Sequence, residues 1–84
     1  MNILIIEDEQ VIANRIKRMT KAYFADVLKK CSHCDSISDG LEFIRDNELD
    51  LLLLDLNLNG ENGFDVLANV VSHSFHTIIV SAYK

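Results

Sequence analysis

The chain has 84 residues, of which 25% are charged and 49% are hydrophobic, with a net charge of -5. This composition is typical of one small folded domain, and it excludes a disordered chain and a second domain of ordinary size. The negative charge argues against nonspecific binding to DNA or to anionic membranes. A secretory leader is not recognisable before Ile3, so we expect a cytoplasmic location and no membrane partner.

The first predicted elements are a strand over residues 2–6 and a helix over residues 9–23. The strand is an uninterrupted apolar run that is too short to span a membrane. The helix is indicated by apolar residues that recur with helical period: Val11, Ile12, Ile16, Met19 and Tyr23. Acidic residues at its start and basic residues later along it agree with the helix dipole.

A second strand is expected over residues 27–34, followed by a second helix that Asp35 or Ser36 can cap. Three apolar residues share one face of this helix: Ile37, Leu41 and Ile44. Gly40 lies inside the helix and lowers its intrinsic stability, and Asn47 ends it.

A third strand is predicted through Leu51 to Asp55, followed by a turn-rich loop over residues 57–63 and a third helix. The third helix would turn four residues inward: Phe64, Leu67, Ala68 and Val71. A fourth strand is expected over residues 77–80. Strands and helices thus alternate with short connections, which predicts an α/β fold with right-handed crossovers and a doubly wound parallel sheet.

Acidic residues stand directly after two of these apolar strands. The first strand is followed by Glu7 and Asp8, and the third ends at Asp55. Ligands of open α/β sheets bind at the carboxyl ends of the strands. If the two strands are neighbours, three carboxylates converge there, which costs free energy unless a cation binds or a carboxylate is protonated. The pattern therefore favours a site for a hard divalent metal ion.

Over the whole chain, these features resemble the receiver domain of two-component response regulators. The matching positions are Glu7-Asp8, Asp55, the loop over residues 56–63, and Ser81-Ala82 after the fourth strand. The resemblance implies a flavodoxin-like fold. The family's fifth strand, with its lysine and its switch aromatic, and the last two helices are not found, because Lys84 comes directly after the fourth strand. We therefore expect residues 1–84 to form a C-terminally truncated, partial receiver domain.

The resemblance also implies a role for each residue of the site. Asp55 would accept the phosphoryl group, and Ser81 would donate a hydrogen bond to a phosphoryl oxygen. Mg2+ would be bound by the side chains of Asp8 and Asp55, by the backbone carbonyl of Asn57, and by Glu7 through water. No other cofactor is implied.

Three further positions of the family pattern lie in the loop and after the fourth strand. Gly63 fits the glycine that ends the family's loop, and Ala82 leaves room for the phosphoryl group. Asn59 stands where a proline is common, a departure that resembles the receivers of LytTR-type regulators.

The expected function is therefore a receiver that takes a phosphoryl group from a sensor histidine kinase. Such a domain catalyses only its own phosphorylation and dephosphorylation, and it would act on DNA only through an output domain that this chain does not contain. The alternative is a truncated, non-phosphorylated interaction module that self-associates through exposed surfaces. Self-association of the truncated chain, by pairing of strand edges or exchange of elements, is also expected if it is a phosphoacceptor. A hydrolase of the same topology is disfavoured, because Glu7-Asp8-Glu9 has no second nucleophilic aspartate in a D-x-D spacing.

Cys31, His33 and Cys34, with His73 and His76 later in the chain, could suggest a zinc or redox site. Cysteines three apart on a strand point to opposite faces, so they can neither pair nor chelate one ion together. We expect both to be free thiols.

Overall fold

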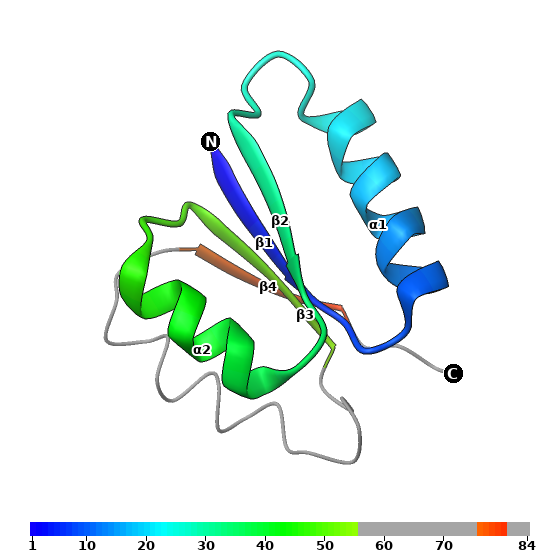
Figure 1. Cartoon of the computed structure of the whole chain (residues 1–84). Coiled ribbons are helices and arrows are strands. Elements are labelled where there is room, and N and C mark those ends of the chain that lie inside the picture. Colours follow the sequence, from blue (N-terminus) through cyan, green and yellow to red (C-terminus); the bar gives the residue numbers. More distant parts are fainter. Residues whose placement is uncertain (56–75, 81–84) are drawn as a thin grey trace.

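The structure, a computed structural model, describes residues 1–55 and 76–80, the last five and Asp55 through their backbone. The described elements in chain order are β1 (Asn2–Ile6), α1 (Gln10–Tyr23), β2 (Lys30–Cys34), α2 (Ile37–Asp46), β3 (Leu51–Asp55) and β4 (His76–Val80) (Figure 1). These strands form a parallel sheet of order β2-β1-β3-β4.

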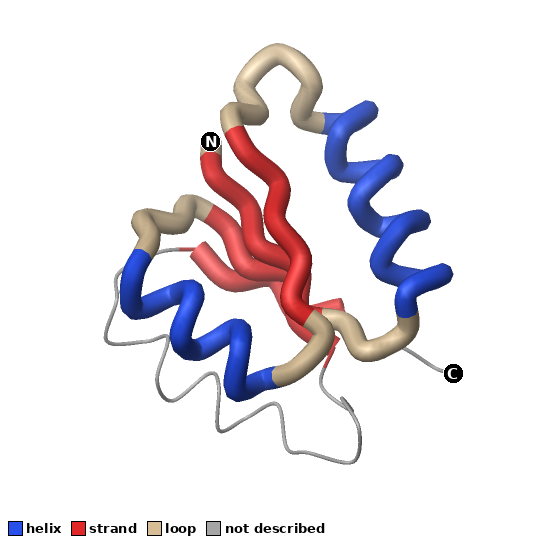
Figure 2. The backbone as a smooth tube through the Cα atoms, in the orientation of Figure 1, coloured by secondary structure: helices blue, strands red, loops and turns tan. Residues whose placement is uncertain are grey.

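The two described helices cover opposite faces of this sheet (Figure 2). Helix α1 packs against β1 and β2 on one face, and α2 packs against the same two strands on the other. The predicted doubly wound α/β architecture is therefore confirmed. No described helix has both the length and the apolar character needed to cross a bilayer.

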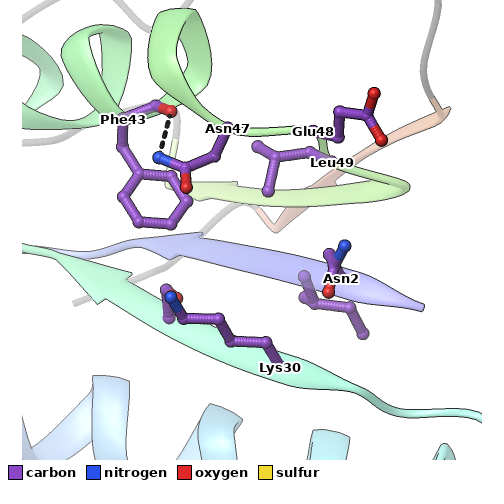
Figure 3. A pocket seen from close by; sticks show the side chains of 8 residues that line it. Asn2, Lys30, Phe43, Asn47, Glu48 and Leu49 are labelled. Atoms are coloured by element: carbon purple, nitrogen blue, oxygen red, sulfur yellow. Dashed lines mark hydrogen bonds between the residues drawn. The ribbon is translucent and has the colours of Figure 1, made fainter.

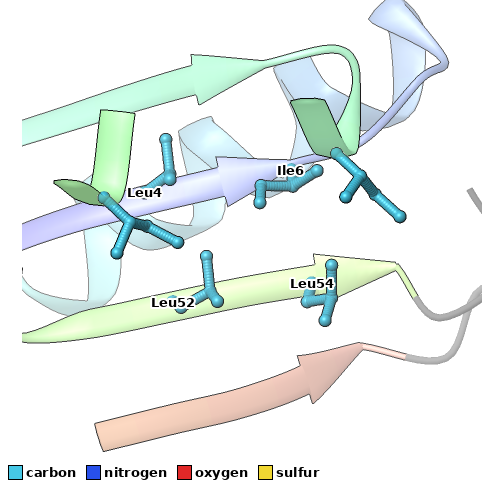
Figure 4. Close-up of a cluster of buried hydrophobic side chains, with 6 residues drawn as sticks. Leu4, Ile6, Leu52 and Leu54 are labelled. Carbon is cyan, nitrogen blue, oxygen red and sulfur yellow. The ribbon is translucent and has the colours of Figure 1, made fainter. Parts of the chain in front are cut away.

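The core on the α2 side of the sheet is made of aliphatic side chains, each no more than 6% exposed. Its members are Leu4, Ile6, Ile37, Ile44, Leu52 and Leu54 (Figure 4). Ile3 and Ile5 alternate with these residues along β1 and are equally buried. The uninterrupted apolar runs thus reflect strands covered on both faces, as predicted. Each buried aliphatic side chain contributes about 1.5 to 3 kcal/mol relative to exposure.

Helix α1 was predicted to within one residue, since Glu9 is its N-cap. Only part of its apolar stripe is buried. Its fully buried residues are Ala13 and the polar Thr20, whose hydroxyl donates to the carbonyl of Ile16 at 2.7 Å. Three large apolar side chains of the stripe are instead exposed: Val11 (71%), Met19 (64%) and Tyr23 (83%).

Strand β2 begins at Lys30, three residues later than predicted. The reason is a turn after α1, in which the backbone amides of Val27 and Leu28 both donate to the carbonyl of Phe24. These two amides therefore cannot also bond to β1. The first amide of this segment that bonds to the chain before β1 is that of Lys29, which donates to the Met1 carbonyl at 2.8 Å.

The structure decides which residue caps helix α2, for which the sequence offered Asp35 or Ser36. The hydroxyl of Ser36 accepts a hydrogen bond from the Asp39 amide at 3.2 Å, so Ser36 is the N-cap. Asn47 ends the helix as predicted, and its side-chain amide donates to the Phe43 carbonyl at 3.0 Å. The start of α2 is thereby fixed relative to the end of β2.

Strand β4 begins at His76, one residue before the predicted start. The predicted loop over residues 57–63 and the predicted third helix, with Phe64, Leu67, Ala68 and Val71, lie outside the described residues. So do Ser81, Ala82, Tyr83 and Lys84.

Candidate functional site

The two acid-tipped strands are direct neighbours in the sheet. The pairing of β1 with β3 runs up to Ile6 opposite Leu54, and the next residues along the two strands are Glu7 and Asp55. On the other side of β3, Asp55 is the register partner of Val80, the residue that precedes Ser81. The register therefore brings the acidic ends of β1 and β3 to one edge of the sheet, as the sequence predicted.

Glu7 and Asp8 lie in the short connection between β1 and α1. The side chain of Glu7 is 1% exposed, and that of Asp8 is half-buried. The Glu7 amide donates to the Cys34 carbonyl at 3.0 Å, so β1 stays paired with β2 one residue beyond its last strand position. At the far end of the connection, the Glu9 carbonyl accepts from the Ala13 amide and opens α1. The connection that carries Glu7 and Asp8 is therefore anchored to the sheet at one end and to the first turn of α1 at the other.

His33 also contacts this connection. Its Nε2 lies 2.8 Å from the backbone carbonyl oxygen of Glu7, across 26 residues of sequence. Sequence reasoning considered His33 only as a zinc or redox ligand and missed this contact. One signal could have found it, because His33 is one residue from the carboxyl end of β2, at the same edge of the sheet as Glu7.

The predicted site residues are therefore only partly described. Glu7 and Asp8 are placed with their side chains, and Asp55 is placed through its backbone at the end of β3. Asn57, Asn59, Gly63 and Ser81 lie outside the described residues. Within the described part of the chain, no three His, Cys, Asp or Glu side chains form a metal-binding group. The carboxylates that are placed are the hard oxygen donors that Mg2+ prefers.

The two cysteines are free and face opposite sides of the sheet, as predicted. Cys34 packs against the core on the α2 side. Burial raises the pKa of the Cys31 thiol, while Lys17 and Lys21 of α1 act in the opposite direction. Burial also raises the pKa of the Cys34 thiol, and Asp39 and Asp35 add to that effect. Both thiols are therefore protonated and poorly nucleophilic at neutral pH.

A small cavity of about 120 Å³ lies near the amino ends of β1 and β2, away from the acidic edge (Figure 3). It is lined by Asn2, Ile3, Lys30, Ser32, Phe43, Asn47, Glu48 and Leu49. The ammonium of Lys30 lies 5.9 Å from the centre of the Phe43 ring, which suits a weak cation–π contact. This cavity is separate from the carboxylates of the site.

Comparison with known families decides the identity of the chain. Residues 3–84 match the family described as the response regulator receiver domain. The chain belongs to this family. The family assignment agrees with the acidic residues that follow neighbouring parallel strands in the structure.

Several curated relatives of this receiver chain are sensory transduction proteins. LytR of Staphylococcus epidermidis is 29% identical to it over 100% of this chain, and LytT of Enterococcus faecalis is 30% identical over 87% of this chain. LytT of Bacillus subtilis is 26% identical over 99% of the chain. These relatives support the expected likeness to LytTR-type regulators. The receiver chain spans about a third of their length, 29% to 34%.

Two solved structures share the fold of this receiver chain. The MaeR response regulator bound to beryllium trifluoride superimposes with a TM-score of 0.87 at 22% identity. The match covers 100% of this chain and 69% of that one. A MaeR mutant bound to sulfate gives a TM-score of 0.84 at 21% identity, covering 99% of this chain and 68% of that one. The flavodoxin-like α/β fold is thereby confirmed.

Proposed function

We propose that this receiver domain accepts a phosphoryl group from a sensor histidine kinase onto Asp55. The observation that carries the proposal is the register, in which Asp55 ends β3 beside the β1 strand that leads into Glu7 and Asp8. A carboxylate oxygen of Asp55 attacks phosphorus, the phosphorus–nitrogen bond to the kinase imidazole breaks, and the imidazole takes up a proton. The product is an acyl phosphate on Asp55.

The carboxylates of this edge fit a magnesium site. Asp8 and Asp55 would bind Mg2+ through their side chains, Asn57 would bind it through its backbone carbonyl, and Glu7 would do so through water. When bound, Mg2+ would neutralise negative charge on the phosphoryl oxygens. In support, Glu7 and Asp8 follow β1 at the edge where β3 ends in Asp55, and carboxylates are the hard oxygen donors that Mg2+ prefers.

Ser81 would donate a hydrogen bond to a phosphoryl oxygen. In support, Val80, which precedes Ser81, is the register partner of Asp55. The proposed cellular setting is the cytoplasm. DNA would be contacted only through an output domain of the whole regulator, and there is room for one because this chain covers 33% of the length of LytR of Staphylococcus epidermidis.

The experiment is to add Mg2+ with acetyl phosphate, and separately with beryllofluoride, to the full chain. We expect a covalent phosphoryl adduct by mass spectrometry and beryllofluoride occupancy by fluorine NMR. Asp55→Asn should abolish both signals. Asp50→Asn should keep them, because it removes an exposed charge just before β3 and leaves an oxygen that can still accept from the Asn2 amide. A folded wild-type chain that shows neither signal would contradict the proposal.

The second candidate function is an interaction module that self-associates without phosphorylation. It is favoured by a hollow of about 320 Å³ beside α1 with mostly apolar lining: Ile16, Met19, Thr20, Tyr23, Phe24 and Leu53. Exposed apolar surface of this kind commonly marks a contact with another protein. Sedimentation should then show dimers whose fraction falls in Met19→Lys. A stable monomer at micromolar concentration would exclude this function.

A further inference from the structure

His33 connects β2 to the peptide that leads into the proposed magnesium ligand Asp8. Its Nε2 lies 2.8 Å from the Glu7 carbonyl oxygen. A carbonyl oxygen only accepts, so Nε2 carries the proton and donates. The acceptor belongs to the peptide that joins Glu7 to Asp8. The hydrogen bond therefore fixes the plane of the peptide from which Asp8 leaves the strand.

A second hydrogen bond acts on the same residue. The Glu7 amide donates to the Cys34 carbonyl at 3.0 Å, so both peptide groups of Glu7 are tied to the end of β2. The bond to the Cys34 carbonyl is a main-chain bond that almost any residue at position 34 could make. The bond to the Glu7 carbonyl depends on the imidazole, because it comes from the side chain of His33. The imidazole of His33 therefore holds the Glu7–Asp8 peptide in place, and a residue without a side-chain donor at position 33 could not do so.

We propose that His33 is a positioning residue for the magnesium site, acting through the Glu7–Asp8 peptide and not by binding the metal. The inference rests on the proposed function. Mg2+ demands near-ideal octahedral geometry, so affinity is sensitive to the direction in which a ligand carboxylate leaves the backbone. Groups that orient metal ligands commonly change affinity by about ten- to a hundredfold when they are removed.

The test compares three variants of the full chain. His33→Leu removes the donor, His33→Gln keeps a side-chain N–H donor, and Ser32→Ala is the control one residue earlier on β2. Mg2+ binding is measured by calorimetry, and the backbone amide shifts of Glu7 and Asp8 are followed by NMR without and with Mg2+. Unfolding in denaturant without Mg2+ gives the stability of each variant.

We expect His33→Leu to weaken Mg2+ binding by about tenfold and to shift the Asp8 amide signal even without metal. His33→Gln should recover most of the affinity, and Ser32→Ala should match the wild type. If His33 has only a structural role, His33→Leu lowers stability while the folded protein binds Mg2+ within twofold of the wild type, which overturns the inference. A folded wild-type chain that does not bind Mg2+ overturns the proposed magnesium site together with the inference.

Discussion

Gly40 of α2 lies directly against the side chain of Ile6 on β1. A β-carbon at position 40 would come within 2.9 Å of Ile6 Cγ1 and closer still to Cδ1. Both residues are buried, and Ile6 is fully enclosed in the core on the α2 side. Glycine is unfavourable inside a helix by about 1 kcal/mol relative to alanine, so its presence here has a packing reason. It lets the helix approach the strand that leads into Glu7.

Gly40→Ala should therefore destabilise the domain although alanine is the better helix former. Overpacking of a dense core costs about 1 to 3 kcal/mol, which exceeds the helical gain of about 1 kcal/mol. Ile6→Val removes the closest atom, so the cost of Gly40→Ala should shrink or reverse in that background. Denaturant unfolding of the two single variants and the double variant gives the coupling. Strictly additive free energies would show that the contact does not matter.

Ser36→Ala should lower the free energy of unfolding by about 1 kcal/mol. The hydroxyl of Ser36 accepts a hydrogen bond from the Asp39 amide, and its loss leaves a first-turn amide without its cap. Ser38→Ala is the matched control, because Ser38 is exposed on the first turn of the same helix. Equal effects of the two substitutions in urea unfolding would argue against the cap.

Asp8→Asn should remove most of the stabilisation that Mg2+ gives to the domain. A ligand that binds only the folded state raises stability with its concentration, so the unfolding midpoint of the wild type should rise as Mg2+ is added. Without the Asp8 charge, that rise should be much smaller. Asp46→Asn is the control, since Asp46 is exposed at the end of α2. Thermal unfolding over a series of Mg2+ concentrations measures the difference, and identical rises would contradict the role of Asp8.

Stability should decline as the pH rises past the ordinary thiol pKa of 9.0. Burial raises the pKa of both Cys31 and Cys34 in the folded state, so above that pH the unfolded chain loses protons that the folded chain still holds. The contribution of these protonated thiols to the free energy of unfolding is fully present below the thiol pKa of the unfolded chain. It is lost as the pH rises through the higher thiol pKa of the folded chain. Replacing both cysteines with alanine should flatten the decline. An unchanged slope in urea unfolding across this range would show that other groups cause it.

The same thiols should react slowly with alkylating reagents while the chain is folded. Denaturation should expose them, and both should then be alkylated quickly, as counted by mass spectrometry. A titration with zinc should give no tight binding, because Cys31 and Cys34 face opposite sides of the sheet. Tight binding of one zinc ion that protects both thiols would contradict this arrangement.

The sequence by itself determined the described strands, helices α1 and α2, and the acidic ends of β1 and β3. These features depend on patterns within a few residues: apolar runs, helical period and the position where a run stops. Even so, the local pattern placed the start of β2 three residues early. The turn after α1 depends on a carbonyl, that of Phe24, which no periodicity reveals.

Only the tertiary structure decided which distant groups meet. The register places Ile6 opposite Leu54 and so aligns Glu7 with Asp55, and the same packing brings His33 to the Glu7 carbonyl. It also decided that Thr20, and not Met19, is buried on α1. Such contacts join residues that are far apart in the chain, and they depend on the register of strands and the rotation of helices. Consecutive residues of β1 are buried and apolar on both faces, so the local pattern does not select one register of the strand over the next.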